Sequence, residues 1–184
     1  NAIYQNISFI DSYDPEYVII LSGDQICKQD YADFLRFHKE KGADFSVAVM
    51  EVDWKEASRF GLMVADENDK ITEFQEKPPV PKSNLASMGI YIFNWDILKK
   101  YLEEDEADPN SKNDFGMNII PALLRDGRKM YAYHFNGYWR DVGTIDSLWE
   151  ANMEVLDPEH SGIDIFDQKW KIYSRNPVLP AQKI

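Results

Sequence analysis

The stretch YVIILSGD, residues 17–24, decides the fold class. Tyr17 to Leu21 is an apolar run of strand length that delivers Ser22-Gly23-Asp24 at its carboxyl end. A continuous apolar run bounded by a turn is typical of a buried strand in a parallel sheet. We therefore expect a central parallel strand, with Asp24 at the edge of the sheet where α/β proteins bind their ligands.

Outward from this strand, helical and strand-like segments alternate. Asp30 is placed to cap a helix that runs to Lys41, and a second apolar strand follows at 45–52. Together with residues 17–21 these segments predict a β-α-β unit, and hence an α/β domain with a mixed, mainly parallel sheet. The remaining expected elements are helices at 1–10, 95–104, 114–125 and 144–156, the last three capped by Asn94, Asp114 and Thr144, a hairpin at 61–74, and strands at 86–93 and 130–135.

Composition and charge exclude several classes of partner. The chain has 184 residues, 20 of them basic and 32 acidic, for a formal net charge of −12. Nucleic-acid binding needs clustered Lys and Arg, so we expect no nucleic-acid partner. No apolar run reaches the length of about 18 residues that a membrane span needs, so we expect no membrane contact. The single cysteine, Cys27, cannot form an internal disulfide, which suits the cytoplasm.

Two segments contain carboxylates in positions that favour metal chemistry. Asp24 follows the apolar strand, and Asp141 lies within the run from Tyr138 to Thr144, which packs aromatic, charged and glycine residues ahead of a helix. If the two carboxylates converge, they could bind one Mg²⁺ together with phosphate oxygens, because this cation prefers one or two carboxylates plus substrate. Alternatively, Asp24 only caps its turn, and Asp141 pairs with Arg140 in a structural turn.

A third segment, Glu76-Lys77-Pro78, offers charge beside the expected hairpin. The Lys77 ammonium could bind a phosphate and Glu76 could accept hydrogen bonds from sugar hydroxyls, although an exposed pair at a strand end explains both equally simply. Ser87 and Tyr91 share one face of the next strand, as in any half-buried strand. The three histidines are scattered, so neither they nor the lone cysteine are assigned to a metal or to nucleophilic catalysis.

Six motifs occur together in one order. They are Ser22-Gly23-Asp24, Arg59-Phe60-Gly61, the run from Phe74 to Pro78, the run from Ser87 to Phe93, Asp114-Phe115-Gly116 and the run from Tyr138 to Thr144. With these motifs the chain closely resembles the bacterial glucose-1-phosphate adenylyltransferases. The resemblance implies a Rossmann-like, GT-A-like sheet and a sugar nucleotidyltransferase that joins ATP and α-D-glucose 1-phosphate into ADP-glucose and pyrophosphate, in glycogen biosynthesis.

The resemblance also implies roles for single residues. Asp24 and Asp141 correspond to the carboxylates that hold Mg²⁺, and Lys77 to the group that binds the phosphate of glucose 1-phosphate; these three would be catalytic. Residues that would line the sugar-phosphate pocket are Gly61, Glu76, Lys77, Ser87, Tyr91, Asp114 and Trp139. One departure is Gln25 and Cys27 after the catalytic aspartate, where the family usually has His and Tyr.

The resemblance further implies that this chain is part of a longer protein. The family's Gly-rich nucleotide loop would precede Asn1, and its left-handed β-helix would be represented at most by a lead-in after Ser161. We therefore expect a catalytic domain at 1–156, a linker and β-helix start at 157–184, and no activity from these residues alone. The intact protein would be a homotetramer, or a heterotetramer with a paralogous subunit. The alternatives are a pyrophosphorylase that uses UTP, dTTP or GTP, and a non-catalytic regulatory subunit.

Overall fold

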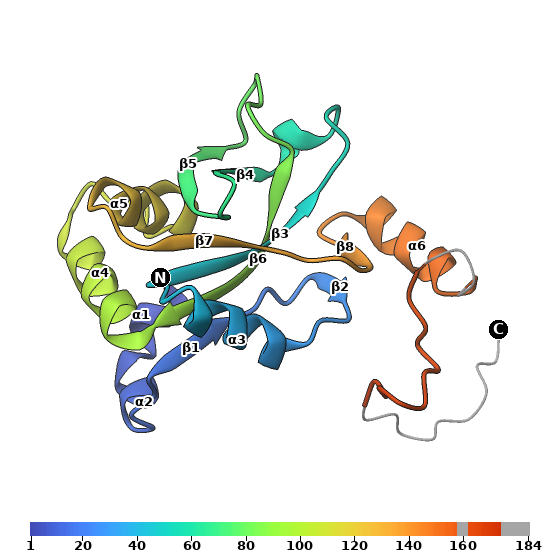
Figure 1. The fold of residues 1–184 in the computed structure, drawn as a ribbon, viewed down its shortest axis with the longest axis horizontal. Helices are drawn as coiled ribbons and strands as arrows, with labels where there is room; N and C mark the ends of the chain where they lie inside the picture. Colours follow the sequence, from blue (N-terminus) through green and yellow to red (C-terminus); the bar gives the residue numbers. More distant parts are fainter. Residues whose placement is uncertain (158–161, 174–184) are drawn as a thin grey trace. The chain divides into compact units, whose positions relative to one another are not determined.

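The computed structural model describes residues 1–157 and 162–173, and the described chain divides into two compact units. Unit 1 comprises residues 1–23 and 29–136, and unit 2 comprises residues 24–28 together with the described residues from 137 onward. Figure 1 shows the elements of each. The predicted boundary at 156 stays a prediction, and the part of the expected β-helix lead-in beyond Tyr173 lies outside the described residues.

Unit 1 is built on a six-stranded sheet with the strand order β5-β4-β6-β3-β7, in which β1 also pairs with β6. The mixed α/β class predicted from the sequence is confirmed. The expectation of a central parallel strand at 17–21 is wrong, because among the described strands β1 pairs with β6 alone, and antiparallel. The four strands β1, β3, β4 and β7 run in one direction, yet β3–β7 is the parallel pairing of this sheet. The strand β6 runs in the opposite direction, so its pairings with β1, β3 and β4 are antiparallel. The β4–β5 pairing is an antiparallel hairpin. The strands are β1 Tyr17–Ile20, β3 Phe45–Glu51, β4 Gly61–Ala65, β5 Ile71–Glu76, β6 Leu85–Asn94 and β7 Met130–His134.

The helices of unit 1 agree closely with those expected. Asp30 caps α3, as predicted, through hydrogen bonds from the backbone N–H groups of Ala32 and Asp33. The predicted helix at 114–125 instead begins as a π-helical turn, η2 (Phe115–Ile119), and continues as α5 (Ile120–Arg125). The other helices of this unit are α1 Ala2–Gln5, α2 Ile7–Asp11, α3 Tyr31–Glu40, the 3₁₀ turn η1 Ala57–Arg59 and α4 Trp95–Ala107.

Unit 2 contains a short ribbon and one helix. β2 (Gln25–Cys27) pairs antiparallel with β8 (Trp139–Asp141), and α6 (Ile145–Glu154) follows. Thr144 caps α6 through a reciprocal capping box with Ser147, as the sequence predicted for Thr144. Among the described residues, no helix is both long and apolar enough to cross a membrane.

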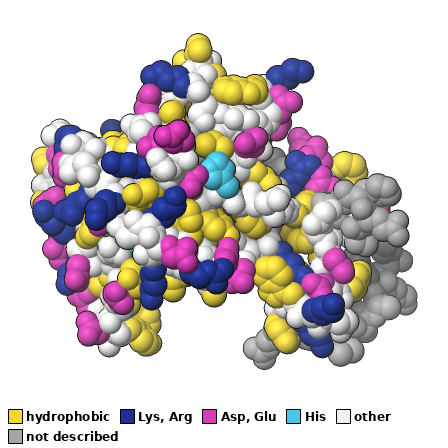
Figure 2. All heavy atoms as spheres, in the orientation of Figure 1, with side chains coloured by type: hydrophobic (Ala, Val, Ile, Leu, Met, Phe, Trp, Pro, Cys, Tyr) yellow, Lys and Arg dark blue, Asp and Glu magenta, His cyan; other side chains and the backbone are white. Residues whose placement is uncertain are grey.

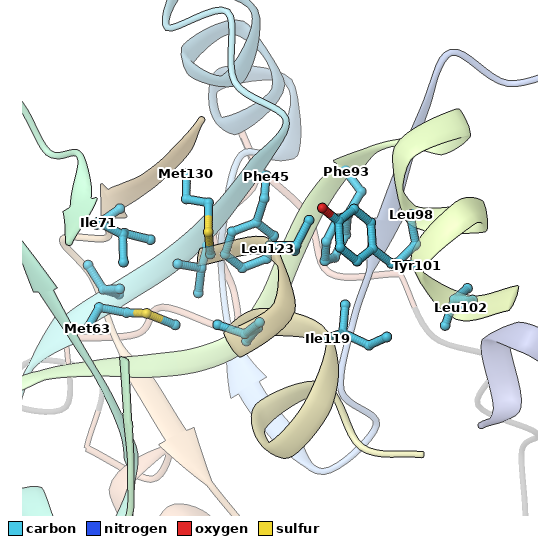
Figure 3. Packing of buried hydrophobic residues seen from close by; sticks show 14 of the residues in the cluster. Phe45, Met63, Ile71, Phe93, Leu98, Tyr101, Leu102, Ile119, Leu123 and Met130 are labelled. Carbon is cyan, nitrogen blue, oxygen red and sulfur yellow. The ribbon is translucent and has the colours of Figure 1, made fainter. Parts of the chain in front are cut away.

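The main hydrophobic core of unit 1 forms where α4, η2 and α5 cover the sheet (Figure 3). Phe45 and Phe93 come from neighbouring strands and are fully buried, with ring centroids 4.7 Å apart. Leu98 and Leu123 bring the helices onto these rings. Burial of such large side chains supplies most of the stability of a domain this size, so this core holds the sheet edges that carry the candidate site.

A buried polar group lies beside this core. His38 is 1% exposed, with Nδ1 2.8 Å from the Ser46 hydroxyl and Nε2 3.1 Å from Asn94 Oδ1. Asn94 occupies the N-cap position of α4, but its side chain makes no capping hydrogen bond because it binds His38 and donates to the Ala43 carbonyl. The prediction that Asn94 caps the helix through its side chain is therefore wrong.

Burial should make the stability of this fold depend on pH through His38. Burial lowers the pKa of His38 below its ordinary value of 6.5, so the unfolded chain binds the proton more readily. The stability that the neutral ring contributes is fully present above about pH 6.5 and is lost as the pH falls below it. Urea unfolding should therefore show that the free energy of unfolding falls more steeply for the wild type than for His38→Gln between about pH 7.5 and about pH 5.5. His134→Gln, at a half-exposed histidine, should keep the steep dependence; equal slopes for the wild type and His38→Gln would contradict the assignment.

Candidate functional site

The two predicted metal carboxylates are brought together in unit 2. Asp24 precedes β2 and Asp141 ends β8, and the Val142 N–H donates to the Asp24 carbonyl oxygen at 2.9 Å. A Cβ placed on Gly143 would lie 3.1 Å from Asp141 Oδ1 and 3.7 Å from Asp24 Oδ2. Both carboxylates therefore face the same small space beside Gly143, although 117 residues separate them in the sequence.

The backbone around Gly143 orients one of these carboxylates. Its N–H donates to Asp141 Oδ1 at 2.9 Å, and the next residue, Thr144, starts α6. Because glycine has no Cβ, the two carboxylates can approach this backbone closely. The alternative that Asp141 pairs with Arg140 is wrong, since the guanidinium of Arg140 binds Glu154.

The donor set of this space suits Mg²⁺. Two carboxylates facing one space are the ligands that this hard cation takes from proteins, with waters and phosphate oxygens completing the octahedron. No group of three or more His, Cys, Asp or Glu side chains able to hold a metal exists among the described residues. A cation at Asp24 and Asp141 would therefore need further oxygen ligands from water or substrate, as Mg²⁺ in phosphoryl-transfer sites does.

Trp139 and Gln25 border the same ribbon. Gln25 lies opposite Asp141 in the β2–β8 register, and its side-chain oxygen accepts a hydrogen bond from the Trp139 indole N–H at 3.2 Å. Residues 139 and 141 share one face of β8 because side chains alternate along a strand. Gln25 therefore orients the indole on the face that carries Asp141.

The opposite face of β8 is tied to α6 by a charged cluster. Glu154 accepts hydrogen bonds from the Tyr138 hydroxyl at 2.6 Å and from Arg140 Nε at 3.0 Å, and its second oxygen binds Arg140 Nη2. The hydrogen bond from Arg140 holds the pKa of Glu154 below its ordinary value. Burial, together with Glu154, raises the pKa of Tyr138 to about 12. Arg140 is therefore engaged by Glu154.

A second cluster lies in unit 1, at the end of the β4–β5 hairpin. Gly61 pairs with Glu76 in the hairpin register, and a Cβ on Gly61 would lie 3.1 Å from Glu76 Oε2. A Cβ on Gly116 would lie only 2.7 Å from the same oxygen and 3.4 Å from Asp114 Oδ1. A side chain at position 61 or 116 would therefore crowd the Glu76 carboxylate. Asp114 lies close to the same carboxylate.

Asp114 is held by the π-helical turn. Its Oδ1 accepts the Met117 N–H at 2.8 Å, and its carbonyl oxygen accepts from Asn118. This confirms the predicted capping role of Asp114. Single π-helical turns are frequent at functional sites, and here the wider turn positions Gly116 against Glu76.

Lys77 directly follows Glu76 and has an unusual backbone. Its φ is +43°, in the left-handed region that non-glycine residues rarely adopt. The side chain is 66% exposed, with Nζ 4.0 Å from Glu76 Oε1. The ammonium is therefore held at long range by Glu76 and stays accessible to a ligand.

Tyr91 and Ser87 border this cluster from β6. The Tyr91 ring stacks on Phe115 with centroids 5.8 Å apart and planes at 15°. Burial raises the pKa of Tyr91, and Glu76 and Asp114 raise it further, so the phenol lies within electrostatic reach of both carboxylates. Ser87 accepts the Gly89 N–H at 3.2 Å, inside a bulge where Gly89 has a φ of +68°.

The comparisons with known proteins agree with this geometry. The pattern of the family described as nucleotidyl transferase matches residues 1–158. The chain belongs to the nucleotidyl transferase family. Among similar curated proteins are the glucose-1-phosphate adenylyltransferases of Clostridium acetobutylicum, 64% identical, Clostridium beijerinckii, 65% identical, and Desulforamulus reducens, 61% identical, each over all 184 residues. This nucleotidyl transferase chain spans about half the length of these relatives, namely 48%, 47% and 46%.

The predicted residues of this nucleotidyl transferase chain thus form two groups. Asp24, Asp141 and Trp139 lie together in unit 2, whereas the other predicted residues belong to unit 1. Two further residues were not predicted from the sequence, namely Gly143, which the two predicted metal carboxylates face, and Glu154, which engages Arg140. Gly143 carried a signal, since it lies in the quoted run from Tyr138 to Thr144, but nothing in the sequence singled out Glu154. The unit 1 residues that the sequence predicted are Gly61, Glu76, Lys77, Ser87, Tyr91 and Asp114.

The charges of the unit 1 cluster can be tested by titrating Glu76. Burial raises its pKa above the ordinary value of 4.5, Asp114 adds to the rise, and Lys77 opposes it. Asp114→Asn should therefore lower the pKa of Glu76, and Lys77→Gln should raise it further, as measured from the side-chain carboxyl carbon by NMR. Lys82→Gln, which removes a lysine that pairs with Glu73, should leave it unchanged. Shifts of the same sign for Asp114→Asn and Lys77→Gln would contradict the proposed arrangement.

Proposed function

We propose that the chain is part of a glucose-1-phosphate adenylyltransferase, which converts ATP and α-D-glucose 1-phosphate into ADP-glucose and pyrophosphate. The observation that carries the proposal is the pair of carboxylates, Asp24 and Asp141, facing one space beside Gly143. Its setting is a nucleotidyl transferase chain. The choice of nucleotide and sugar is supported by the names of relatives that are 59–65% identical.

In this reaction a phosphate oxygen of glucose 1-phosphate forms a bond to the α-phosphorus of ATP, and the bond from that phosphorus to the β-phosphate bridge breaks. Such a displacement needs positioning and charge neutralisation more than a covalent nucleophile. Asp24 and Asp141 would hold Mg²⁺, which when bound neutralises charge on phosphate oxygens. Lys77, exposed and weakly held by Glu76, would bind the phosphate of the sugar.

The unit 1 cluster suits a sugar. Glu76 and Asp114 are hydrogen-bond acceptors set close to glycines, so hydroxyl groups could donate to them at the open backbone of Gly61 and Gly116. The stacked rings of Tyr91 and Phe115 would give the sugar an apolar wall. Ser87 belongs to this proposed set, whereas Trp139, the remaining proposed binding residue, lies in unit 2.

For the intact protein we further propose a cytoplasmic, tetrameric and allosterically regulated enzyme of glycogen synthesis. The names of the relatives support the metabolic assignment. The single cysteine suits a reducing compartment. The net charge of −12 does not attract anionic substrates, so local cations such as Lys77, together with Mg²⁺, would have to attract them. On the face shown in Figure 2, Lys and Arg side chains are interspersed with Asp and Glu, so that face presents no broad basic patch for the substrates.

Removing one metal carboxylate should abolish the reaction. In the intact protein, Asp24→Asn and Asp141→Asn should each lower kcat by roughly 10³-fold or more, because each removes a charged metal ligand while keeping the side-chain size. Asp146→Asn, an exposed carboxylate in the first turn of α6, should leave kcat unchanged. Pyrophosphate release under saturating Mg²⁺ measures all three. Full activity in Asp24→Asn would favour a regulatory subunit over a catalyst.

Lys77 should affect one substrate more than the other. Lys77→Glu in the intact protein should raise the KM for glucose 1-phosphate by roughly 100-fold, because it replaces a phosphate-binding charge by a repelling one. The KM for ATP should change far less. Lys82→Glu, at another exposed lysine of the same loop, should change neither constant. Equal increases in both KM values for Lys77→Glu would contradict the assignment.

A further inference from the structure

The ribbon that carries the metal carboxylates has little intrinsic stability. β2 and β8 have three residues each, and none of their side chains is fully buried. An isolated two-stranded ribbon of this length is marginal in water. Asp24 and Asp141 lie at the same end of this ribbon, just before β2 and at the end of β8, and they must stay close enough to share one cation. Some other interaction in unit 2 must therefore hold β8 in place.

The Glu154 cluster supplies that interaction. Figure 1 shows α6 beside β8, and Glu154 is the last residue of α6. Its carboxylate binds Arg140 through two nitrogens and accepts the Tyr138 hydroxyl at 2.6 Å. The two-pronged contact of a guanidinium with a carboxylate is both strong and directional. It therefore fixes the angle of α6 against β8 as well as their distance.

The Glu154 cluster acts on Asp141 from the opposite face of β8. Side chains alternate along a strand, so Arg140 lies on the face opposite Trp139 and Asp141. At the other end, the chain from Asp141 to Thr144 closes into the capping box of α6. Asp141 is thus fixed from both sides, by Arg140 just before it and by the start of α6 just after it. Glu154 acts on Asp141 indirectly, through Arg140 and Tyr138 on the same strand segment.

The cluster also sets the charge beside the metal site. Arg140 is the residue next to Asp141, and a free guanidinium there would compete with a divalent cation for the carboxylate. Glu154 neutralises Arg140 on the far face of the strand. The guanidinium of Arg140 is therefore directed away from Asp141.

We propose that Glu154 is a positioning residue for the cation-binding carboxylates, acting through Arg140 and Tyr138. This rests on the proposed function, since the cation site is part of it. Residues that orient metal ligands from outside the coordination shell commonly change metal affinity by about 10- to 100-fold when they are substituted. Substitution of Glu154 should therefore lower the affinity for a divalent cation. It should change kcat at saturating cation only slightly.

The test compares neighbouring carboxylates on one helix of the intact protein. Glu154→Gln removes the charge that binds Arg140, and Tyr138→Phe removes one hydroxyl while keeping the Arg140–Glu154 pair. Glu150→Gln makes the same charge change one turn earlier, at an exposed residue that acts on Arg140 through space without a hydrogen bond to it, and is the matched control for the direct contact. Mn²⁺ binding, followed by electron paramagnetic resonance, gives the affinity directly. The Mg²⁺ concentration for half-maximal activity gives a second measurement.

Glu154→Gln should weaken Mn²⁺ binding about 10-fold. It should raise the half-maximal Mg²⁺ concentration in parallel and regain most of kcat at saturating Mg²⁺. Tyr138→Phe should shift both measurements in the same direction by less, and Glu150→Gln should shift neither. Wild-type Mn²⁺ affinity in both Glu154→Gln and Tyr138→Phe overturns the inference. If Glu154→Gln unfolds the protein, Tyr138→Phe decides.

Asp24→Asn separates this inference from the proposed function. Loss of Mn²⁺ binding in Asp24→Asn, with normal binding in the Glu154 and Tyr138 variants, overturns the positioning role alone. Normal Mn²⁺ binding in Asp24→Asn overturns the cation site, and the positioning role with it.

Discussion

Backbone hydrogen bonding along β6 is the constraint on which unit 1 depends. This one strand pairs with β1, β3 and β4, so it joins the hairpin to the rest of the sheet. Because it runs against its neighbours, three strands that share a direction can lie around it with their backbone groups satisfied. The hairpin that ends in Glu76 is attached to the sheet through this strand.

β6 also shapes the candidate site through its irregularity. Opposite Val47 and Val49 its register shifts, and Gly89 adopts a left-handed conformation inside the bulge. Bulges of this kind redirect side chains and are common beside functional sites. Ser87 and Tyr91 lie at the two ends of the irregular segment, so the same strand that organises the sheet also presents two of the predicted binding residues.

The sequence predicted the elements well and their pairings less well. Apolar runs, caps and turn residues are local signals, so the hairpin after Gly61 and the caps Asp30, Asp114 and Thr144 were predictable. The position of β6 between β1 and β3 is set by long-range hydrogen bonding, which no local pattern encodes. Asn94 shows the same limit, because its side chain binds the distant His38 in preference to its own helix. For the site, motif order predicted Asp24 with Asp141, whereas Glu154 depends on α6 packing against β8.

Backbone strain marks the unit 1 cluster as more than a strand end. Among the described residues, four non-glycine residues have positive φ: Asp14, Asp69, Lys77 and Asn113. Two of them, Lys77 and Asn113, adjoin Glu76 and Asp114 respectively. The left-handed backbone conformation is unfavourable for a lysine. Such strain persists only where the surrounding structure enforces it. The two turns aim like-charged carboxylates at one place, and burial with mutual repulsion raises the pKa of Glu76. Hydroxyl donors would relieve this repulsion without bringing a charge of their own. For this reason we propose a sugar at this cluster, and we propose that the exposed ammonium of Lys77 binds the phosphate.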